Sequence, residues 1–366
     1  MMLVLIAVAV ALVIGTSYVS SAIIKTAGSR NLLKASRARY LAESGMQHAI
    51  YMMWNDPSSL DGTSSNNPRG PFAADNTADR YSFWATPDGV DIGLYHVTAR
   101  ATADGMSQDA RWSIYRTPAY DMVVLSKSPE AYWRFGEPHS TWLAHDSAGA
   151  GYDMVGFGGV DMGEQGALVN GSNTAVVLDG YNEYFYRPPT GALQMRTDLT
   201  ISMWFKMDHL PYGSDKAFLV TCSEEGEEQD RNALYQLTIN SQGKLEYLHE
   251  FHSGYDQSTV FQNASFSAGT WHNLVVTRDW ANSTIKVYLQ GQLVDTWTFT
   301  NPGTPPPASG GQSGLYVGSA WGDEDFFDGT IDELALLDRP LTAQEVATIH
   351  SVGGTPAVVQ VRSSDD

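Results

Sequence analysis

The chain opens on an uncharged apolar run from Met1 to Ile24, which contains no proline. Roughly 20 apolar residues are enough for a helix to cross a bilayer, so this run is long enough to enter a membrane. The first charge, Lys25, follows the run, whereas a secretory signal peptide places basic residues before its apolar stretch. Apolar residues then recur at three- and four-residue steps with no proline before Pro57, which predicts one helix over residues 1–54.

The segment after the helix predicts a small antiparallel sheet. Residues 55–79 are rich in Pro, Gly, Ser, Asn and Asp, which indicates a loop. Alternating apolar and polar residues then predict three strands, at residues 81–85, 95–101 and 108–116. A sheet of three strands beside a long helix is an α+β arrangement, and we expect it to pack on the second half of the helix.

From Glu130 to about Gly353 the chain changes to short strands separated by turn residues. Residues 199–206 alternate polar with apolar side chains, as a half-buried strand does. Short strands with turn signals at regular intervals predict a β-sandwich. Near its end, Thr342 followed three residues later by Glu345 predicts a capping box that starts a helix.

The predicted fold class is therefore α+β followed by all-β: a long N-terminal α-helix with a small antiparallel sheet, and then a β-sandwich. We expect four segments in order: the helix over residues 1–54, the loop and small sheet over 55–127, the sandwich over 128–354, and a flexible polar tail over 355–366.

Composition narrows the classes of partner. The formal net charge of −19 disfavours nucleic acid and anionic lipid as partners. Cys222 is the only cysteine, which excludes an intrachain disulfide and every multi-cysteine metal site. An exported protein without disulfides depends on its core, and a bound calcium ion is a candidate for a second source of stability.

The predicted helix resembles the N-terminal helix of type IV pilins and pseudopilins, especially the minor-pilin group. The specific part is Arg37 to Met53, RARYLAESGMQHAIYMM. The resemblance implies that the apolar half anchors the subunit in the inner membrane before assembly and then packs with other copies in the core of a filament. The residues that it assigns to assembly are Met1, Leu3, Leu5, Ile6, Val10, Leu12 and Ile14.

One position departs from the family pattern. Pilins usually carry a glutamate at the fifth position of the mature chain, and this chain has Leu5. If Met1 is the mature N-terminus, as we expect from the apolar start, the usual ion pair with a neighbour's amine is missing. This favours a minor or tip role. An ordinary single-pass anchor followed by a stalk is the alternative interpretation of the helix.

A second resemblance covers the predicted sandwich. Motifs follow one another in the order of a LamG-like, concanavalin A-like jelly roll, and the match is most specific toward the end of the chain. The matching segments are residues 131–137, 145–149, 175–180, 199–206, 271–278, 285–291, 315–318, 327–334 and 338–342. The resemblance implies a jelly roll over residues 128–354.

The spacing of the carboxylates does not predict catalysis. A jelly-roll glycosidase needs two carboxyl groups about 5–5.5 Å apart, or about 6.5–9.5 Å apart if it inverts. Glu246 and Glu250 are too far apart along one strand, and Asp325 and Asp328 lie in a glycine-bounded loop. We therefore expect no enzyme.

Calcium is the metal that we expect, if any is bound. The ion takes six to eight oxygen ligands, which acidic loops supply. LamG-like domains often hold one such ion, and the resemblance implies Asp146, the Gly149 carbonyl and Asp332 as its ligands. One of Asp332 and its neighbour Glu333 should point inward. The alternative is that Asp332 only accepts backbone hydrogen bonds.

Aromatic side chains in or beside loops are candidates for stacking on sugar rings. We assign ligand binding to Trp321, Asp323 and Asp325, because an exposed aromatic residue beside acceptors suits a sugar. Other candidates of the same kind are Tyr181, Tyr184, Tyr186, Tyr255, Phe326 and Phe327.

Together these features predict a subunit of an extracellular type IV pilus-like filament. Such a subunit would be a homo-oligomer through its N-terminal helices, anchored in the inner membrane before assembly and located on the cell surface afterwards. The alternative is a minor or tip pilin, or an adhesin, whose jelly roll binds glycans or matrix. A weaker alternative is a pseudopilin of a secretion system.

Overall fold

The structure is a computed structural model of the chain. It describes the backbone of residues 2–55, 59–74, 78–89, 91–116, 119–169, 173–188, 191–225, 231–249, 257–301, 303, 313–322, 325–354 and 359–363. The same side chains are described, except those of residues 2–15, 54, 116, 224–225, 231–232, 313 and 359–363. The seven predicted assembly residues and Asp323 therefore lie outside the described side chains. The chain divides into two compact units, residues 1–118 with 357–366, and residues 119–356.

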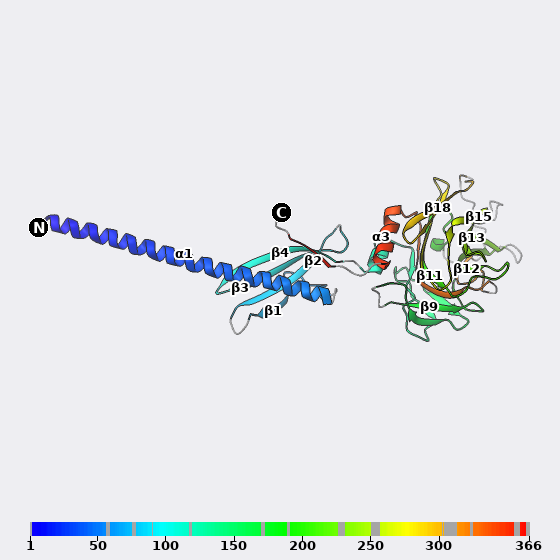
Figure 1. Cartoon of the computed structure of the whole chain (residues 1–366), viewed down its shortest axis with the longest axis horizontal. Helices are drawn as coiled ribbons and strands as arrows, with labels where there is room; N and C mark the ends of the chain where they lie inside the picture. The colour runs from blue at the N-terminus through cyan, green and yellow to red at the C-terminus, as the bar shows by residue number, and fades with distance from the viewer. Residues whose placement is uncertain are drawn as a thin grey trace. The chain divides into compact units, whose positions relative to one another are not determined.

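The first unit is one long helix beside an antiparallel sheet. Helix α1 (Met2–Asn55) lies along strands β2 (Arg80–Pro87), β3 (Leu94–Ala103) and β4 (Met106–Arg116), as Figure 1 shows. Helix and sheet share a core because small and apolar residues of α1 meet the inward face of the strands. This core contains Ala38, Ala42, Met46, Ala49, Met53, Phe83, Val97 and Ala99, all essentially buried. The predicted helix and its packing on three strands are confirmed.

The sheet is larger than the sequence predicts. Its order is β1-β2-β3-β4-β21, with β1 (Arg69–Ala73) inside the predicted loop and β21 (Val359–Ser363) inside the predicted tail. The expectation of a flexible tail is therefore wrong for residues 359–363. The physical reason is that the edge of β4 offers unpaired backbone donors and acceptors, and β21 pairs with them from Val359 to Ser363.

The second unit is a sandwich of two antiparallel sheets. One sheet has the order β15-β14-β13-β12-β19-β10-β7-β6, and the other has the order β18-β17-β16-β11-β20-β9-β8 with β5 also paired to β20. The first contains β6 (Leu143–Ala144), β7 (Met154–Phe157), β10 (Tyr184–Arg187), β12 (Ala217–Glu225), β13 (Arg231–Ile239), β14 (Lys244–His249), β15 (Gln257–Ser265) and β19 (Ser313–Val317). The second contains β5 (Ala131–Trp133), β8 (Asp161–Gln165), β9 (Thr174–Asp179), β11 (Leu199–Met207), β16 (His272–Asp279), β17 (Thr284–Leu289), β18 (Gln292–Thr298) and β20 (Asp328–Leu337).

Apolar side chains from both sheets fill the space between them. Trp133, Phe185, Phe205 and Tyr235 are fully buried there. One cation shares this core: Arg278 of β16 has no solvent exposure. Its guanidinium donates hydrogen bonds to the carbonyl oxygens of Met195, Thr197 and Leu234 and to the Tyr247 hydroxyl.

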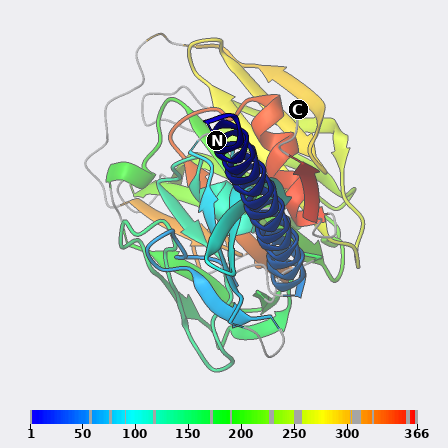
Figure 2. The same ribbon diagram turned by 90° about the vertical axis from the view of Figure 1, so that its left-hand side faces the viewer.

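Two helices cover the outer face of the β11-containing sheet. Helix α2 (Tyr120–Leu125) lies at the end of the segment predicted as loop and small sheet, residues 55–127, and it contacts α3 (Ala343–Gly354). Both views place α3 beside β18 (Figures 1 and 2). A second core forms between them and the sheet from Tyr120, Trp204, Val275, Tyr288, Val346 and Ile349.

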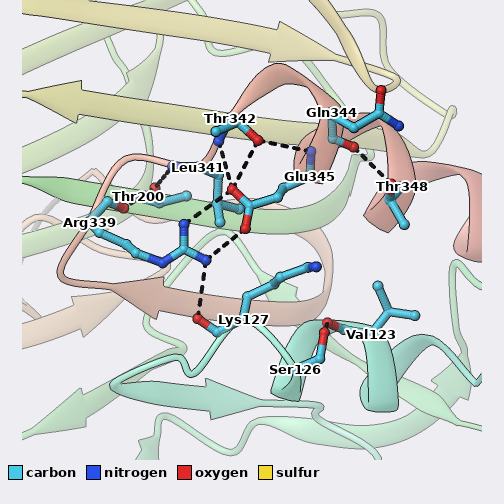
Figure 3. Close-up of polar contacts among 10 residues, drawn as sticks. All are labelled: Val123, Ser126, Lys127, Thr200, Arg339, Leu341, Thr342, Gln344, Glu345 and Thr348. Carbon is cyan, nitrogen blue, oxygen red and sulfur yellow. Dashed lines mark hydrogen bonds and ion pairs between the residues drawn. The ribbon is translucent and has the colours of Figure 1, made fainter. Parts of the chain in front are cut away.

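The predicted capping box at the start of α3 is confirmed (Figure 3). Glu345 accepts hydrogen bonds from the Thr342 backbone N–H at 2.9 Å and from its hydroxyl at 3.0 Å, and Thr342 Oγ1 accepts the Glu345 N–H. The Arg339 guanidinium donates to both Glu345 oxygens at 2.8 and 3.1 Å. Arg339 also donates to the Lys127 carbonyl, which ties α3 to the turn after α2.

This cap gives the second unit a testable pH dependence. The Arg339 hydrogen bonds lower the pKa of Glu345 to about 2. A folded-state pKa below the unfolded one stabilises the fold above the unfolded pKa, and that stability is lost as pH falls from about 4.3 toward 2. We expect Glu345→Gln to lower stability by about 1 kcal/mol at neutral pH and to change little at low pH. Thermal melts across pH would measure the effect, with Gln344→Ala as the control on the same turn. Equal changes in Tm for the two variants at neutral pH would contradict the prediction.

Over the part of the chain that the structure describes, no helix carries a stretch both long and apolar enough to cross a membrane.

Candidate functional site

Two of the candidate ligand-binding residues, Trp321 and Asp325, lie in the connection between β19 and β20. Trp321 follows β19 in a turn where the Ser319 hydroxyl accepts the Gly322 N–H at 2.8 Å. The Trp321 ring is half-buried and lies 6.3 Å from the Phe218 ring, so it is less open than the sequence predicts. Asp325 stands on the loop before β20 with φ of 53°. The structure therefore brings Asp325, but not the ring of Trp321, into the cleft described next.

A cleft of about 290 Å³, which we call the rim cleft, opens between the segment after β11 and the loop before β20. The first segment supplies His209, Tyr212, Asp215 and Lys216, and the second supplies Asp325, Phe326 and Asp328. The Tyr212 side chain is 90% exposed. His209 Nδ1 lies 3.0 Å from Asp328 Oδ2, and Lys216 Nζ lies 2.6 Å from Glu246 Oε2. His209 and Lys216 are thus each paired with a carboxylate, and carboxylates dominate the charge of the cleft.

A group of aromatic rings, which we call the aromatic patch, adjoins the cleft. It consists of Phe157, Tyr184, Tyr186, Tyr316 and Phe326. Phe157 and Tyr184 stack with centroids 5.1 Å apart and an interplanar angle of 10°, and Phe326 lies 6.2 Å from Tyr184. Phe326 belongs to both the patch and the rim cleft, which makes the two surfaces continuous.

Strand alternation explains why these rings face outward. Successive side chains of a strand point to opposite faces of the sheet. Phe185 of β10 is fully buried in the core, so its neighbours Tyr184 and Tyr186 stand on the other face. The candidate Phe327 is also fully buried and is therefore wrong as a surface residue, whereas Tyr181 is 78% exposed and Tyr255 lies outside the described residues.

Two adjacent carboxylates of β20 are buried. Both Asp332 and Glu333 have no solvent exposure, although alternation along β20 predicts that only one points inward. A register irregularity opposite Ser202 and Trp204, with φ of 53° at Glu333, changes the alternation. The prediction that only one of Asp332 and Glu333 points inward is therefore wrong.

Donors surround the buried pair. The Asn173 side-chain amide donates to Asp332 at 3.1 Å and to Glu333 at 2.9 Å, and the Tyr132 hydroxyl donates to Glu333. The Ala167 N–H donates to Asp332 at 2.8 Å. Burial raises the pKa of Glu333 to about 7, although the Arg134 charge opposes the rise, and burial also raises the pKa of Asp332 well above its usual value. Because neither carboxylate reaches the surface, the pair is not placed to act on an external substrate.

Asp146 serves a different loop. Its carboxylate accepts the backbone N–H groups of Tyr132, Ala148, Ala150 and Tyr152, at 2.9 to 3.2 Å. Each of the two carboxylate oxygens of Asp146 thus accepts two backbone N–H groups. A carboxylate with this set of donors organises the loop between β6 and β7.

The two carboxylates among the predicted calcium ligands each accept hydrogen bonds from the protein itself. The Tyr132 backbone N–H donates to Asp146, while the hydroxyl at the other end of Tyr132 donates to Glu333, next to Asp332. The carboxylates of Asp146 and Asp332 also already accept N–H donors. Among the described residues, no group of three or more His, Cys, Asp or Glu could hold a metal ion. Calcium binding by Asp146, the Gly149 carbonyl and Asp332 stays a prediction.

Comparison with known families identifies the fold family of residues 179–347. A family model described as the concanavalin A-like lectin/glucanases superfamily matches residues 179–347, from the end of β9 into α3. Residues 179–347 form a concanavalin A-like jelly-roll domain. The jelly roll thus includes the rim cleft, Trp321 and the buried carboxylate pair, while Phe157 of the aromatic patch lies before the matched segment.

Similar solved structures are distant. A Trypanosoma rangeli sialidase in complex with the inhibitor DANA is 12% identical, with 74% of this chain and 51% of that chain covered and a TM-score of 0.44. The receptor-binding domain of botulinum neurotoxin C/D mosaic serotype is 11% identical, with 61% and 51% covered and a TM-score of 0.46. The binding domain of Paraclostridial Mosquitocidal Protein 1 is 13% identical, with 62% and 52% covered and a TM-score of 0.45. The chain spans about half the length of these proteins, and no curated protein matches it.

Proposed function

We propose that the protein is a subunit of an extracellular type IV pilus-like filament. In this proposal α1 anchors the subunit in the membrane before assembly and then packs with the helices of other copies, so that the jelly roll is displayed at the cell surface. The observation that carries the proposal is the exposure of α1. Every residue from Thr16 to Leu33 is exposed, including large apolar side chains.

The exposed face of α1 needs a partner. Tyr18, Ile23, Ile24, Leu32 and Leu33 are 62 to 77% exposed. Burying each Leu or Ile contributes roughly 1.5–3 kcal/mol, so leaving this face in water is unfavourable. A second copy of the chain presents the same apolar helix, and helix-to-helix packing between copies would bury both. The apolar run before Thr16 continues this helix, although its side chains lie outside those described.

The structure fixes where the test truncation must begin. Removing all of α1 would strip Ala38, Ala42, Met46 and Met53 from the core of the first unit. A chain that begins at Ser29 keeps all four of these core residues, and the described side chains that it loses, from Thr16 to Gly28, are exposed. We expect full-length protein to form filaments visible by electron microscopy, and the chain from Ser29 to remain a folded monomer by light scattering and circular dichroism.

One control variant and two contrary outcomes complete the assembly test. Tyr212→Ala removes an exposed aromatic side chain from the jelly roll and should leave filaments unchanged. Filaments formed by the chain from Ser29 would overturn the role of the apolar helix. Folded full-length protein that forms no long polymer would instead support the minor-subunit or pseudopilin alternatives.

The second candidate function is carbohydrate binding by the displayed jelly roll, in an adhesin or tip subunit. The match to the concanavalin A-like lectin/glucanases superfamily favours it, as does the rim cleft with its exposed aromatic residue and carboxylates. We propose binding without catalysis, because the adjacent carboxylates Asp332 and Glu333 are fully buried. The experiment that tests this function is designed below together with the site.

A further inference from the structure

We infer that the rim cleft and the aromatic patch together form one elongated binding track for a neutral polysaccharide chain. The inference rests on the proposed carbohydrate-binding function and adds the site and the class of ligand. It assigns the anchoring role to Tyr212 and Phe157, in place of Trp321.

The first argument is continuity. Tyr212 stands on one side of the rim cleft, and Phe326 stands on the other. Phe326 then contacts Tyr184, and Tyr184 stacks on Phe157. Tyr316 adjoins Tyr184 at 6.2 Å and Tyr186 at 4.9 Å, which widens the surface. A series of rings of this extent offers stacking positions for several consecutive sugar units, whereas a monosaccharide would contact only one or two.

The second argument is chemical. Ligand sites combine aromatic walls with a few polar groups that fix orientation. In the rim cleft, Asp215, Asp325 and Asp328 supply acceptors for sugar hydroxyl groups beside the Tyr212 and Phe326 rings. Tyr212, at 90% exposed, has its ring available to a ligand.

The third argument selects the class of sugar by charge. Three carboxylates line the described part of the rim cleft, and its lysine already lies 2.6 Å from Glu246. No arginine is among the described lining residues, although arginine is the side chain best suited to carboxylate or sulfate groups. With a net charge of −19 on the whole chain, an acidic glycan would be repelled. A neutral chain of hexoses is the ligand that this surface fits.

The experiment measures binding of full-length protein to a soluble mixed-linkage β-glucan, a galactomannan and the acidic polymer alginate. We expect binding to a neutral polymer, with competition by its hexasaccharide and little competition by the monosaccharide. Tyr212→Ala and Phe157→Ala should each weaken binding at least tenfold, because interface anchors of this kind carry much of the affinity. Tyr51→Ala, a 67% exposed tyrosine of α1, is the matched control and should bind like the wild type.

Each other outcome overturns a defined part of the proposal. Neutral-polymer binding that survives both Tyr212→Ala and Phe157→Ala in folded protein would overturn the track and leave the carbohydrate-binding function standing. Binding of alginate alone would overturn the ligand class. Wild-type protein that binds none of the three polymers would overturn the carbohydrate-binding proposal, and the track with it.

Discussion

Arg278→Ala is expected to lower the stability of the jelly roll by several kcal/mol. The guanidinium is fully buried and donates to three backbone carbonyls and one hydroxyl. The alanine variant leaves these acceptors without their donor, and each buried unsatisfied polar group costs about 1–3 kcal/mol. It also leaves a cavity in a core that both sheets share. Urea denaturation followed by tryptophan fluorescence would measure the loss as a lower midpoint.

Matched variants separate the hydrogen bonds from the charge. Arg278→Lys keeps the positive charge, but an ammonium group cannot make the same set of hydrogen bonds as the planar guanidinium. We therefore expect the stability of this variant to lie between those of the wild type and the alanine variant. Arg111→Ala removes a 71% exposed arginine and should change stability by no more than about 0.5 kcal/mol. An Arg278→Ala protein with an unchanged midpoint would show that water or rearranged side chains satisfy the three carbonyls.

Asp146→Ala is the second variant with a large expected effect. The side chain orders the loop between β6 and β7 by accepting four backbone N–H groups. Hydrogen bonds to a charged group contribute about 1.5–3 kcal/mol each, so a loss of about 3 kcal/mol or more is expected. Thermal melting with and without excess EGTA would be measured on the wild type and on the variant.

The chelator makes this experiment a test of calcium as well. If the N–H donors account for the role of Asp146, EGTA leaves the wild-type Tm unchanged while Asp146→Ala lowers it. If calcium holds the loop, EGTA lowers the wild-type Tm to that of the variant and added calcium restores it. Asp161→Ala, which removes a 60% exposed aspartate paired with His139, is the control for loss of charge alone.

Local patterns in the sequence determine the elements of this protein. The three- and four-residue spacing of apolar residues predicts α1, and period-two alternation predicts β2, β3, β4 and β11, because these repeats follow from the geometry of helix and strand. The capping box at Thr342 and Glu345 is equally local, since both partners lie within one turn. Such features need no knowledge of distant residues.

The pairing of distant segments is decided only by the tertiary structure. Val359–Ser363 is a short segment of two valines among polar residues, and its pairing partner, the edge of β4, lies far away in the sequence. Burial of both Asp332 and Glu333 needs the irregularity opposite β11 together with donors from Tyr132, Ala167 and Asn173.

The candidate site shows the same division. The sequence identifies Asp325 and the tyrosines of β10 as candidates, because an aromatic or acidic residue near a turn is visible locally. It does not show that Tyr212, Phe326 and Phe157 share one surface, since these residues are far apart in the chain. Which apolar residues remain on the surface is likewise a tertiary outcome: Phe327 enters the core while its neighbour Phe326 stays half-exposed.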